Sequence, residues 1–318
     1  MFPLRRRSMF AALPTLALAR PALATWPEQA IRLITPFPPG ATSDSAARGI
    51  AQVLSQGYQR SVVVDNRPGA GGGIGAQQAL SARPDGYTLL LVNNAVLSMV
   101  PRLSEVKFDP TRDFAPVAFL GDSYNLLAIS PHLAVQDFAG FVRLVREHPG
   151  EFVYASPGVG SYGHVAGAML QRRLGLEMLH APFNGIVPAI NAVLAGHAHA
   201  VMGPNTLPFA QSGNLRGIAV IGSHRWPDLA GVPTLPELGL ADWSLDFWYA
   251  VVAPAGTPLE RRQKLQVDFA AAMRTPAVGP LLERVGLRLA ERSLDEIGDT
   301  IARDWSTMGE ALKAVDLG

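Results

Sequence analysis

Short apolar runs alternate with amphipathic segments along most of the chain. In the first unit, an apolar run at 31–34 precedes a segment from 42 to 54 in which alanine, isoleucine and leucine recur at helical spacing. Strands that alternate with helices usually form a mostly parallel sheet with helices on both faces, so the pattern predicts an α/β fold. Further strands are expected at 62–64, 88–92, 126–129, 152–155, 198–202, 218–221 and 247–253, and further helices at 76–80, 138–147, 164–174 and 188–194, before a mostly helical end.

The alternation starts a second time after a proline-containing connection at 109–116, which indicates two lobes. Without its first 24 residues the chain keeps 294, a length in the range of ~250–300 residues at which a single hydrophobic core stops growing. We expect the chain to cross between the lobes near 122–126 and 244–248. One lobe would contain residues 25–124 and 246–318, and the other residues 125–245.

The first 24 residues have the pattern of an export signal. Three arginines at 5–7 give a basic start, an apolar stretch covers 9–19, and Ala22-Leu23-Ala24 forms an A-x-A cleavage site. The apolar stretch is shorter than the ~20 residues that span a bilayer. We therefore expect cleavage near Ala24 and release into the periplasm. The paired arginines leave twin-arginine export open beside the general secretory route.

Composition excludes several classes of protein. The chain has no cysteine, which excludes disulfides, thiol catalysis and a lipidated cysteine anchor. Removal of the signal takes away four arginines and no acid, leaving 23 basic and 26 acidic residues. This balance gives none of the basic excess that nucleic-acid binding needs.

Two glycine-containing loops, at 37–44 and 155–164, each follow a predicted strand and lead into a predicted helix. In open α/β sheets, ligands bind outside the carboxyl ends of the strands, and helix N-termini favour anions. If the two loops faced each other across a cleft, they would clamp a ligand with acidic groups. Each loop could equally be an ordinary strand-to-helix turn in which a serine or threonine caps the helix.

Other chemical motifs lack the context that they need. The glycine run at 69–75 is separated from the preceding strand, and Asn93 and Asn94 stand where a dinucleotide-binding acid is expected. Ser161 is not in a nucleophile elbow, because Val159 occupies the first glycine position. His197 and His199 have no third metal ligand at a recognisable spacing. We therefore expect no cofactor, no metal and no catalytic residue.

Four motifs in order along the chain carry a family resemblance: PFPPGATSD at 36–44, DNRPGAGGGIG at 65–75, PDGYTLL at 84–90 and APAGTP at 253–258. Together they resemble the Bug family, the extracytoplasmic solute receptors of tripartite tricarboxylate transporters. The resemblance implies a two-lobed periplasmic binding protein fold of type II-like organisation. It also implies that two glycine loops hold a ligand carboxylate through backbone amides, hydroxyls and ordered waters.

The resemblance places the ligand-binding residues on those two loops and on three segments near the cleft. Thr42, Ser43 and Ser161 would hold one carboxylate, while Phe37 with Asn94 or Asn205 would shape the rest of the site. Asp44 would either cap its helix or accept a hydrogen bond from the ligand. The expected set is Phe37, Pro39, Gly40, Ala41, Thr42, Ser43, Asp44, Asn94, Ser156, Gly158, Gly160, Ser161, Phe183, Asn184 and Asn205.

The sequence departs from the family pattern at positions that affect specificity. Ala41 stands where a second glycine is common, and Phe183-Asn184 replaces a tyrosine followed by a lysine or arginine. Asn191 and His199 stand where acids are frequent. A clamp for one carboxylate survives these changes, but they leave the far end of the ligand open.

The favoured hypothesis is a monomeric receptor that captures a small carboxylate, an organic acid or a carboxylated aromatic, by lobe closure. It would deliver this ligand to the membrane subunits of a transporter through transient contact. Two alternatives stay open. One is an adaptor that senses the ligand for a signalling receptor, and the other is a periplasmic enzyme for small acids with His164 as its base.

Overall fold

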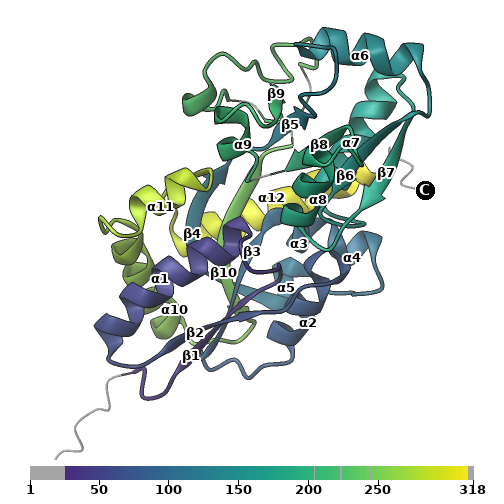
Figure 1. Ribbon diagram of the computed structural model, residues 1–318. Coiled ribbons are helices and arrows are strands. Elements are labelled where there is room, and N and C mark those ends of the chain that lie inside the picture. Colours follow the sequence, from purple (N-terminus) through teal and green to yellow (C-terminus); the bar gives the residue numbers. More distant parts are fainter. Residues whose placement is uncertain (1–25, 204, 223, 242, 244, 314–318) are drawn as a thin grey trace, which may run out of the picture.

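The computed structural model describes residues 26–203, 205–222, 224–241, 243 and 245–313. It contains two β-sheets, one in each lobe, with helices packed around them (Figure 1). The six-stranded sheet has the order β11-β4-β10-β3-β1-β2, and the five-stranded sheet has the order β7-β6-β8-β5-β9. The predicted signal peptide at 1–24 and the expected start of the mature chain at Thr25 lie outside the described residues.

The six-stranded sheet consists of β1 (Ile31–Thr35), β2 (Val62–Asn66), β3 (Thr88–Asn93), β4 (Phe114–Ser123), β10 (Phe247–Pro254) and β11 (Leu287–Leu289). Its lobe also contains α1 (Thr42–Tyr58), α2 (Gly73–Leu80), α3 (Asn94–Ser98), α4 (Val100–Leu103), α5 (Pro110–Asp113), α10 (Leu259–Met273), α11 (Gly279–Arg284) and α12 (Leu294–Lys313). A short 3₁₀ helix at Ala70–Gly72 precedes α2.

The five-stranded sheet consists of β5 (Leu126–Ile129), β6 (Phe152–Ser156), β7 (Met178–Pro182), β8 (Ala200–Gly203) and β9 (Arg216–Val220). The helices of this lobe are α6 (Phe138–Glu147), α7 (Tyr162–Leu174), α8 (Ile186–Leu194) and α9 (Leu207–Gln211), with a 3₁₀ helix at Pro227–Leu229. None of the described helices, in either lobe, has the length and apolar character needed to cross a bilayer.

Most strands of each sheet run in one direction, as the alternating pattern predicts. In the larger sheet β1, β2 and β3 are parallel, and β4 runs with them because β10 is antiparallel to both β3 and β4. In the smaller sheet β6, β7 and β8 are parallel, and β9 runs with them because β5 is antiparallel to both β8 and β9. β11 is also antiparallel to β4, so it runs with β10. β5 and β10 are the first strands of a sheet after the chain has passed from the other sheet.

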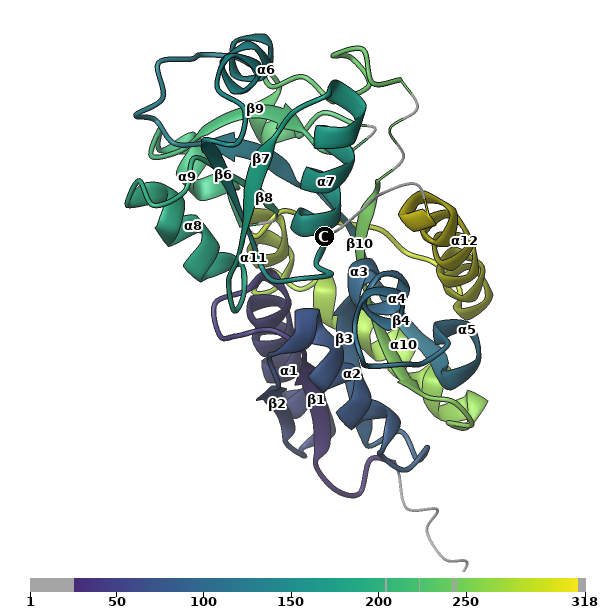
Figure 2. The same ribbon diagram turned by 90° about the vertical axis from the view of Figure 1, so that its right-hand side faces the viewer.

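Helices lie on both faces of the larger sheet (Figure 2). Alternate residues of its central strands pack against the helices of opposite faces. In the larger sheet, Leu89 and Leu91 belong to the same apolar cluster as residues of α1, α10 and α11. Leu90 and Val92 pack in a second cluster with residues of α2, α3 and α12. All four side chains are fully buried, so β3 reads as one continuous apolar run.

The chain passes between the sheets twice. β4 ends at Ser123 and β5 begins at Leu126, while β9 is followed by a long connection before β10 begins at Phe247. We propose that the lobe boundaries lie at these passages, at residues 124–125 and 245–246. Part of the second predicted crossing, at Ser244, lies outside the described residues.

Three strands were not expected from the apolar pattern. β7 and β11 are edge strands, and β7 has only one buried position, Met178, and ends in a proline. β4 begins within the region expected to be a connection at 109–116, which also contains α5. Pro116 lies within β4, and proline is uncommon inside strands, so the sequence did not indicate a strand there. The pairing of β4 with β10 also contains register shifts.

Candidate functional site

A small, buried cavity lies where the two lobes meet. Its volume is about 30 Å³, enough for a water molecule or two. Phe37, Ala41, Thr42, Gly71, Asn93, Ala95, Phe247 and Tyr249 line it from the six-stranded lobe, and Pro157, Ser161, Tyr162, Gly163 and Ile186 line it from the five-stranded lobe. This inner cavity is thus bounded by both glycine loops, as the clamp hypothesis requires.

A larger outer compartment of about 270 Å³ continues from the inner cavity toward the surface. The two spaces share Phe37, Gly71 and Pro157 in their walls. The outer compartment is lined by residues 36–38 and 68–72 of one lobe and by residues 157–159 and 182–185 of the other. Together they form one inter-lobe cleft with a narrow inner end.

Two long helices, one from each lobe, begin at the inner cavity. α1 starts at Thr42, and no side chain caps its first N–H groups. α7 starts at Tyr162, and its N-cap Ser161 accepts a hydrogen bond from the N–H of His164 at 3.4 Å. The capping interpretation therefore holds for Ser161 but not for Thr42 or Ser43. Unpaired N–H groups and the helix dipole make both starts favourable for an anion.

The lobes contact each other at the edge of the cleft, through Asn205 of one lobe and the first glycine loop of the other. The Asn205 amide donates to the carbonyl oxygen of Gly40 at 3.1 Å, and the Thr42 hydroxyl donates to Asn205 Oδ1. Asn205 itself has a left-handed backbone (φ 62°), a conformation that asparagine tolerates better than most residues. We name these contacts the Asn205 latch; they hold the cleft closed in this structure.

Backbone also meets backbone across the cleft. Gly71 has a φ of 65°, and a Cβ at this position would lie 2.9 Å from the carbonyl oxygen of Val159 in the other lobe. At the hinge side, the Tyr162 hydroxyl donates to the carbonyl oxygens of Leu245 and Ile221 at 2.9 and 3.1 Å. Its ring meets Phe247 edge-on at 4.5 Å. The closed arrangement is thus packed on both sides of the inner cavity.

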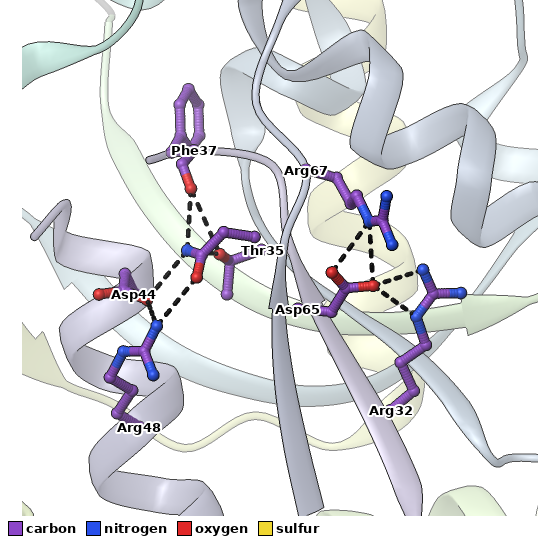
Figure 3. A network of polar contacts seen from close by, with 8 residues as sticks. Arg32, Thr35, Phe37, Asp44, Arg48, Asp65 and Arg67 are labelled. Atoms are coloured by element: carbon purple, nitrogen blue, oxygen red, sulfur yellow. Dashed lines mark hydrogen bonds and ion pairs between the residues drawn. The ribbon is translucent and has the colours of Figure 1, made fainter. Parts of the chain in front are cut away.

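Thr35, Phe37, Asp44 and Arg48 lie around one network of polar contacts (Figure 3). Asn66, at the end of β2, connects them and organises the first glycine loop. Its side-chain amide donates to Thr35 Oγ1 at 2.8 Å, to the carbonyl oxygen of Phe37 at 3.0 Å and to Asp44 Oδ1 at 2.9 Å. Its own oxygen accepts from Arg48 at 2.9 Å. Asn66 therefore connects the end of β1, the loop and the start of α1. The motif at 65–75 contained this residue, but nothing in its spacing indicated the role.

Asp44 completes this network. One carboxylate oxygen accepts from the Gly40 N–H at 2.9 Å, and the other lies 2.9 Å from Arg48. Burial opposes ionisation, but the Arg48 guanidinium and the hydrogen bonds from Gly40 and Asn66 hold the pKa of Asp44 below its usual value. Asp44 lines neither the inner cavity nor the outer compartment, and its contacts with the Gly40 N–H and Arg48 support the first glycine loop.

Asn94, which was predicted to shape the ligand site, lines neither the inner cavity nor the outer compartment in this structure. Its side chain is fully buried and donates to the carbonyl oxygen of Asp246 at 3.0 Å and to Asp304 Oδ1 at 3.1 Å. The preceding Asn93 lines the inner cavity instead. Asn93 is the last residue of β3 and caps α3 through Val96, and side chains at neighbouring positions point in different directions there.

The remaining predicted residues divide into lining and supporting groups. Phe37, Ala41, Thr42 and Ser161 line the inner cavity, and Phe37, Gly158, Phe183 and Asn184 line the outer compartment. Pro39, Gly40, Ser43, Ser156, Gly160 and Asn205 line neither space. The supporting role is clear for Ser156, whose hydroxyl accepts from the Gly158 N–H at 3.2 Å and lies 2.7 Å from His180 Nε2.

His164 lies behind the second glycine loop rather than in the cavity. Its Nδ1 accepts from the Gly160 N–H at 3.1 Å, and its ring stacks on His180 at 4.0 Å. Burial lowers the pKa of His164, and burial together with His164 lowers the pKa of His180 to about 4. Both rings are therefore neutral supports of the loop at pH 7, and the predicted base role for His164 has no geometric basis.

His199 also supports the structure. His199 Nδ1 accepts from the Val153 N–H at 2.9 Å, and its ring packs against Phe152. Across the described ranges there is no group of three or more histidine, cysteine or acidic side chains that could hold a metal ion.

Sequence reasoning missed several residues of the inner cavity. Gly71, Ala95 and Ile186 were not predicted to line it, and Asn93 lies in a segment that the resemblance placed near the cleft, where Asn94 was chosen instead. Phe247 and Tyr249 lie at or just after the second predicted crossing, and both form part of the cavity wall.

Comparison with known proteins agrees with this geometry. The tripartite tricarboxylate transporter family receptor model matches residues 46–317. Protein BugT of Bordetella pertussis (strain Tohama I) is 35% identical over 251 residues, which cover 76% of each chain. These findings cover most of the two lobes.

Solved structures share the fold. The periplasmic binding protein BugD superposes with a TM-score of 0.85 at 26% identity, over 91% of this chain and 98% of that chain. The structure of R. palustris Rpa4515 with adipate superposes with a TM-score of 0.85 at 29% identity, over 91% and 97%. The predicted two-lobed periplasmic binding protein fold is confirmed, and the chain belongs to the tripartite tricarboxylate transporter receptor family, which includes the Bug proteins.

Proposed function

We propose that this protein is a receptor that captures a small carboxylate between its lobes and delivers it to the membrane subunits of a tripartite tricarboxylate transporter. The observation that carries the proposal is the meeting of the α1 and α7 N-termini, one from each lobe, at one inner cavity. Capture by two opposed helix starts requires closure, because neither lobe alone surrounds the ligand. The adipate bound to the similar R. palustris protein supports an acid as ligand.

Delivery follows from closure in this proposal. The closed lobes bring residues 68–72 and 157–159 together at the mouth of the cleft, which gives a membrane partner a surface that the open receptor lacks. The chain would reach the periplasm through the export signal at 1–24 and act there as a monomer, in transient contact with the transporter. It needs no cofactor and performs no catalytic step.

Thermal unfolding of the chain from Thr25 onward tests the proposal. The protein would first be stripped of carried-over ligand by unfolding and refolding, and then heated with mono-, di- and tricarboxylates and with their neutral amides. A ligand at 100 times its Kd that binds only the folded state adds about 2.7 kcal/mol of stability. We expect a rise in Tm with at least one acid and none with the matched amide. If no acid raises Tm, the carboxylate receptor proposal is wrong.

A further inference from the structure

The charged residues of this protein avoid the inter-lobe cleft. Among the described residues, no aspartate, glutamate, lysine, arginine or histidine lines either the inner cavity or the outer compartment. A separate pocket beside the crossing segments, also about 270 Å³, is lined by Asp122, His224, Asp246, Arg288 and Arg292. Charged side chains therefore lie beside the crossing segments, whereas none of the described charged side chains lines the inner cavity or the outer compartment.

The groups that favour an anion are concentrated at the inner end of the cleft. The starts of α1 and α7 both face the inner cavity. A third helix, α8, also begins at the inner cavity, which its first residue Ile186 lines, although Pro188 removes one N–H group from its first turn. The cleft thus has one well-equipped anion position rather than two.

Polar side chains around the inner cavity are already engaged. Asn93 Oδ1 accepts from the Val96 N–H at 3.1 Å, the Tyr162 hydroxyl contacts the carbonyl oxygens of Leu245 and Ile221, and the Thr42 hydroxyl donates to Asn205. Most other wall residues are apolar, glycine or proline, and Phe37 lines both the inner cavity and the outer compartment. A second ionised carboxylate in the cleft would lose its hydration without gaining a cation.

We infer that the ligand carries a single carboxylate, held at the α1 and α7 N-termini, on an uncharged and largely apolar body that extends past Phe37 toward Phe183 and Asn184. The inference rests on the proposed function and names its ligand class. It selects monocarboxylates over dicarboxylates and tricarboxylates of the same carbon skeleton, because only the first negative charge finds a prepared position.

Isothermal titration with three ligands that share a six-carbon acid chain tests this inference: hexanoate, adipate and monomethyl adipate. Hexanoate and adipate share a chain and differ by one carboxylate, while the methyl ester keeps the size of adipate and removes its second charge. We expect hexanoate and monomethyl adipate to bind about 10- to 100-fold more tightly than adipate. Benzoate against benzene-1,4-dicarboxylate repeats the comparison on a rigid aromatic body.

The outcomes separate this inference from the proposed function. If adipate binds as tightly as hexanoate or more tightly, the single-charge inference is wrong while the receptor proposal stands. If the methyl ester binds as weakly as adipate, size rather than charge decides, and the inference is again overturned. If none of the acids binds in titration and none raises Tm, the proposed function itself fails.

A variant at the mouth of the cleft gives an independent arm. Asn184 is exposed and lines the outer compartment, so Asn184→Lys adds a cation there without disturbing a core. Asn184→Gln is the matched control of similar length without charge. We expect Asn184→Lys to strengthen adipate binding relative to hexanoate by about two- to fivefold, the range for an exposed ion pair. An unchanged ratio would mean that the second carboxylate does not lie in the outer compartment, contrary to the inference.

Discussion

Replacing Asn205 by glycine removes the latch between the lobes while keeping the local backbone. Asn205 lies at φ 62°, where alanine would be strained and glycine is not. The change deletes the hydrogen bond from its amide to the Gly40 carbonyl and the one that it accepts from Thr42. Everything else that the two loops contribute to the cavity stays in place.

The size of the effect follows from these two contacts. A hydrogen bond contributes about 0.5–1.5 kcal/mol net, so the pair stabilises the closed form by about 1–3 kcal/mol, or about 5- to 150-fold in the open–closed equilibrium. If binding needs the closed form, the apparent Kd rises as the population of that form falls. We therefore expect Asn205→Gly to be more open without ligand and to bind its carboxylate less tightly, with little change in the ligand-bound shape.

Small-angle X-ray scattering with and without ligand, combined with titration calorimetry, measures both quantities. Asn214→Gly is the control, because Asn214 is an exposed residue of the same lobe. A radius of gyration and a Kd for Asn205→Gly that match those of Asn214→Gly would refute the latch. A tighter Kd would also refute it, since it would mean that Asn205 competes with the ligand for Thr42.

Three further substitutions test the cleft and its loop. Asn66→Ala leaves several buried polar groups of the first loop without their partner, so urea unfolding should show a loss of about 1–3 kcal/mol; an unchanged midpoint would contradict the network. Gly71→Ala places a methyl group against Val159 and should weaken ligand binding by preventing full closure, whereas Gly57→Ala, which meets nothing, should not. Asp44 has a lowered pKa in the folded state, so its contribution is present above the unfolded pKa and is lost as pH falls through the folded pKa. The stability difference between wild type and Asp44→Asn should therefore shrink from pH 7 toward pH 3, and a constant difference would contradict this.

The apolar pattern predicted most of the fold because burial dictates it locally. β3 packs alternate leucines against different helix layers, and its continuous apolar run identifies a central strand without knowledge of its neighbours. The edge strands β7 and β11 escaped prediction for the opposite reason. An edge strand is specified by its pairing with one neighbour, and a half-exposed segment of three to five residues carries little periodic signal.

The two glycine loops were predictable as segments, but the direction of each side chain within them was not. Thr42 and Ser161 reach the cavity, whereas Asp44 turns back to the Gly40 N–H and Asn94 points away toward Asp304. These directions depend on contacts between residues far apart in the chain. Loop composition alone cannot distinguish a side chain that lines a cavity from one that supports the loop.

The same long-range contacts explain how a cleft without charged walls can still be selective. Asn66 and Asp44 fix the first loop from behind, and His164 and Ser156 fix the second, so that polar side chains support the backbone while N–H groups face the cavity. A lysine or arginine in the wall would attract any anion and would carry its own desolvation cost on closure. Under the proposed function, a site built from helix starts would attract charge only where both lobes have come together, so that recognition of a carboxylate and closure of the lobes would be one event.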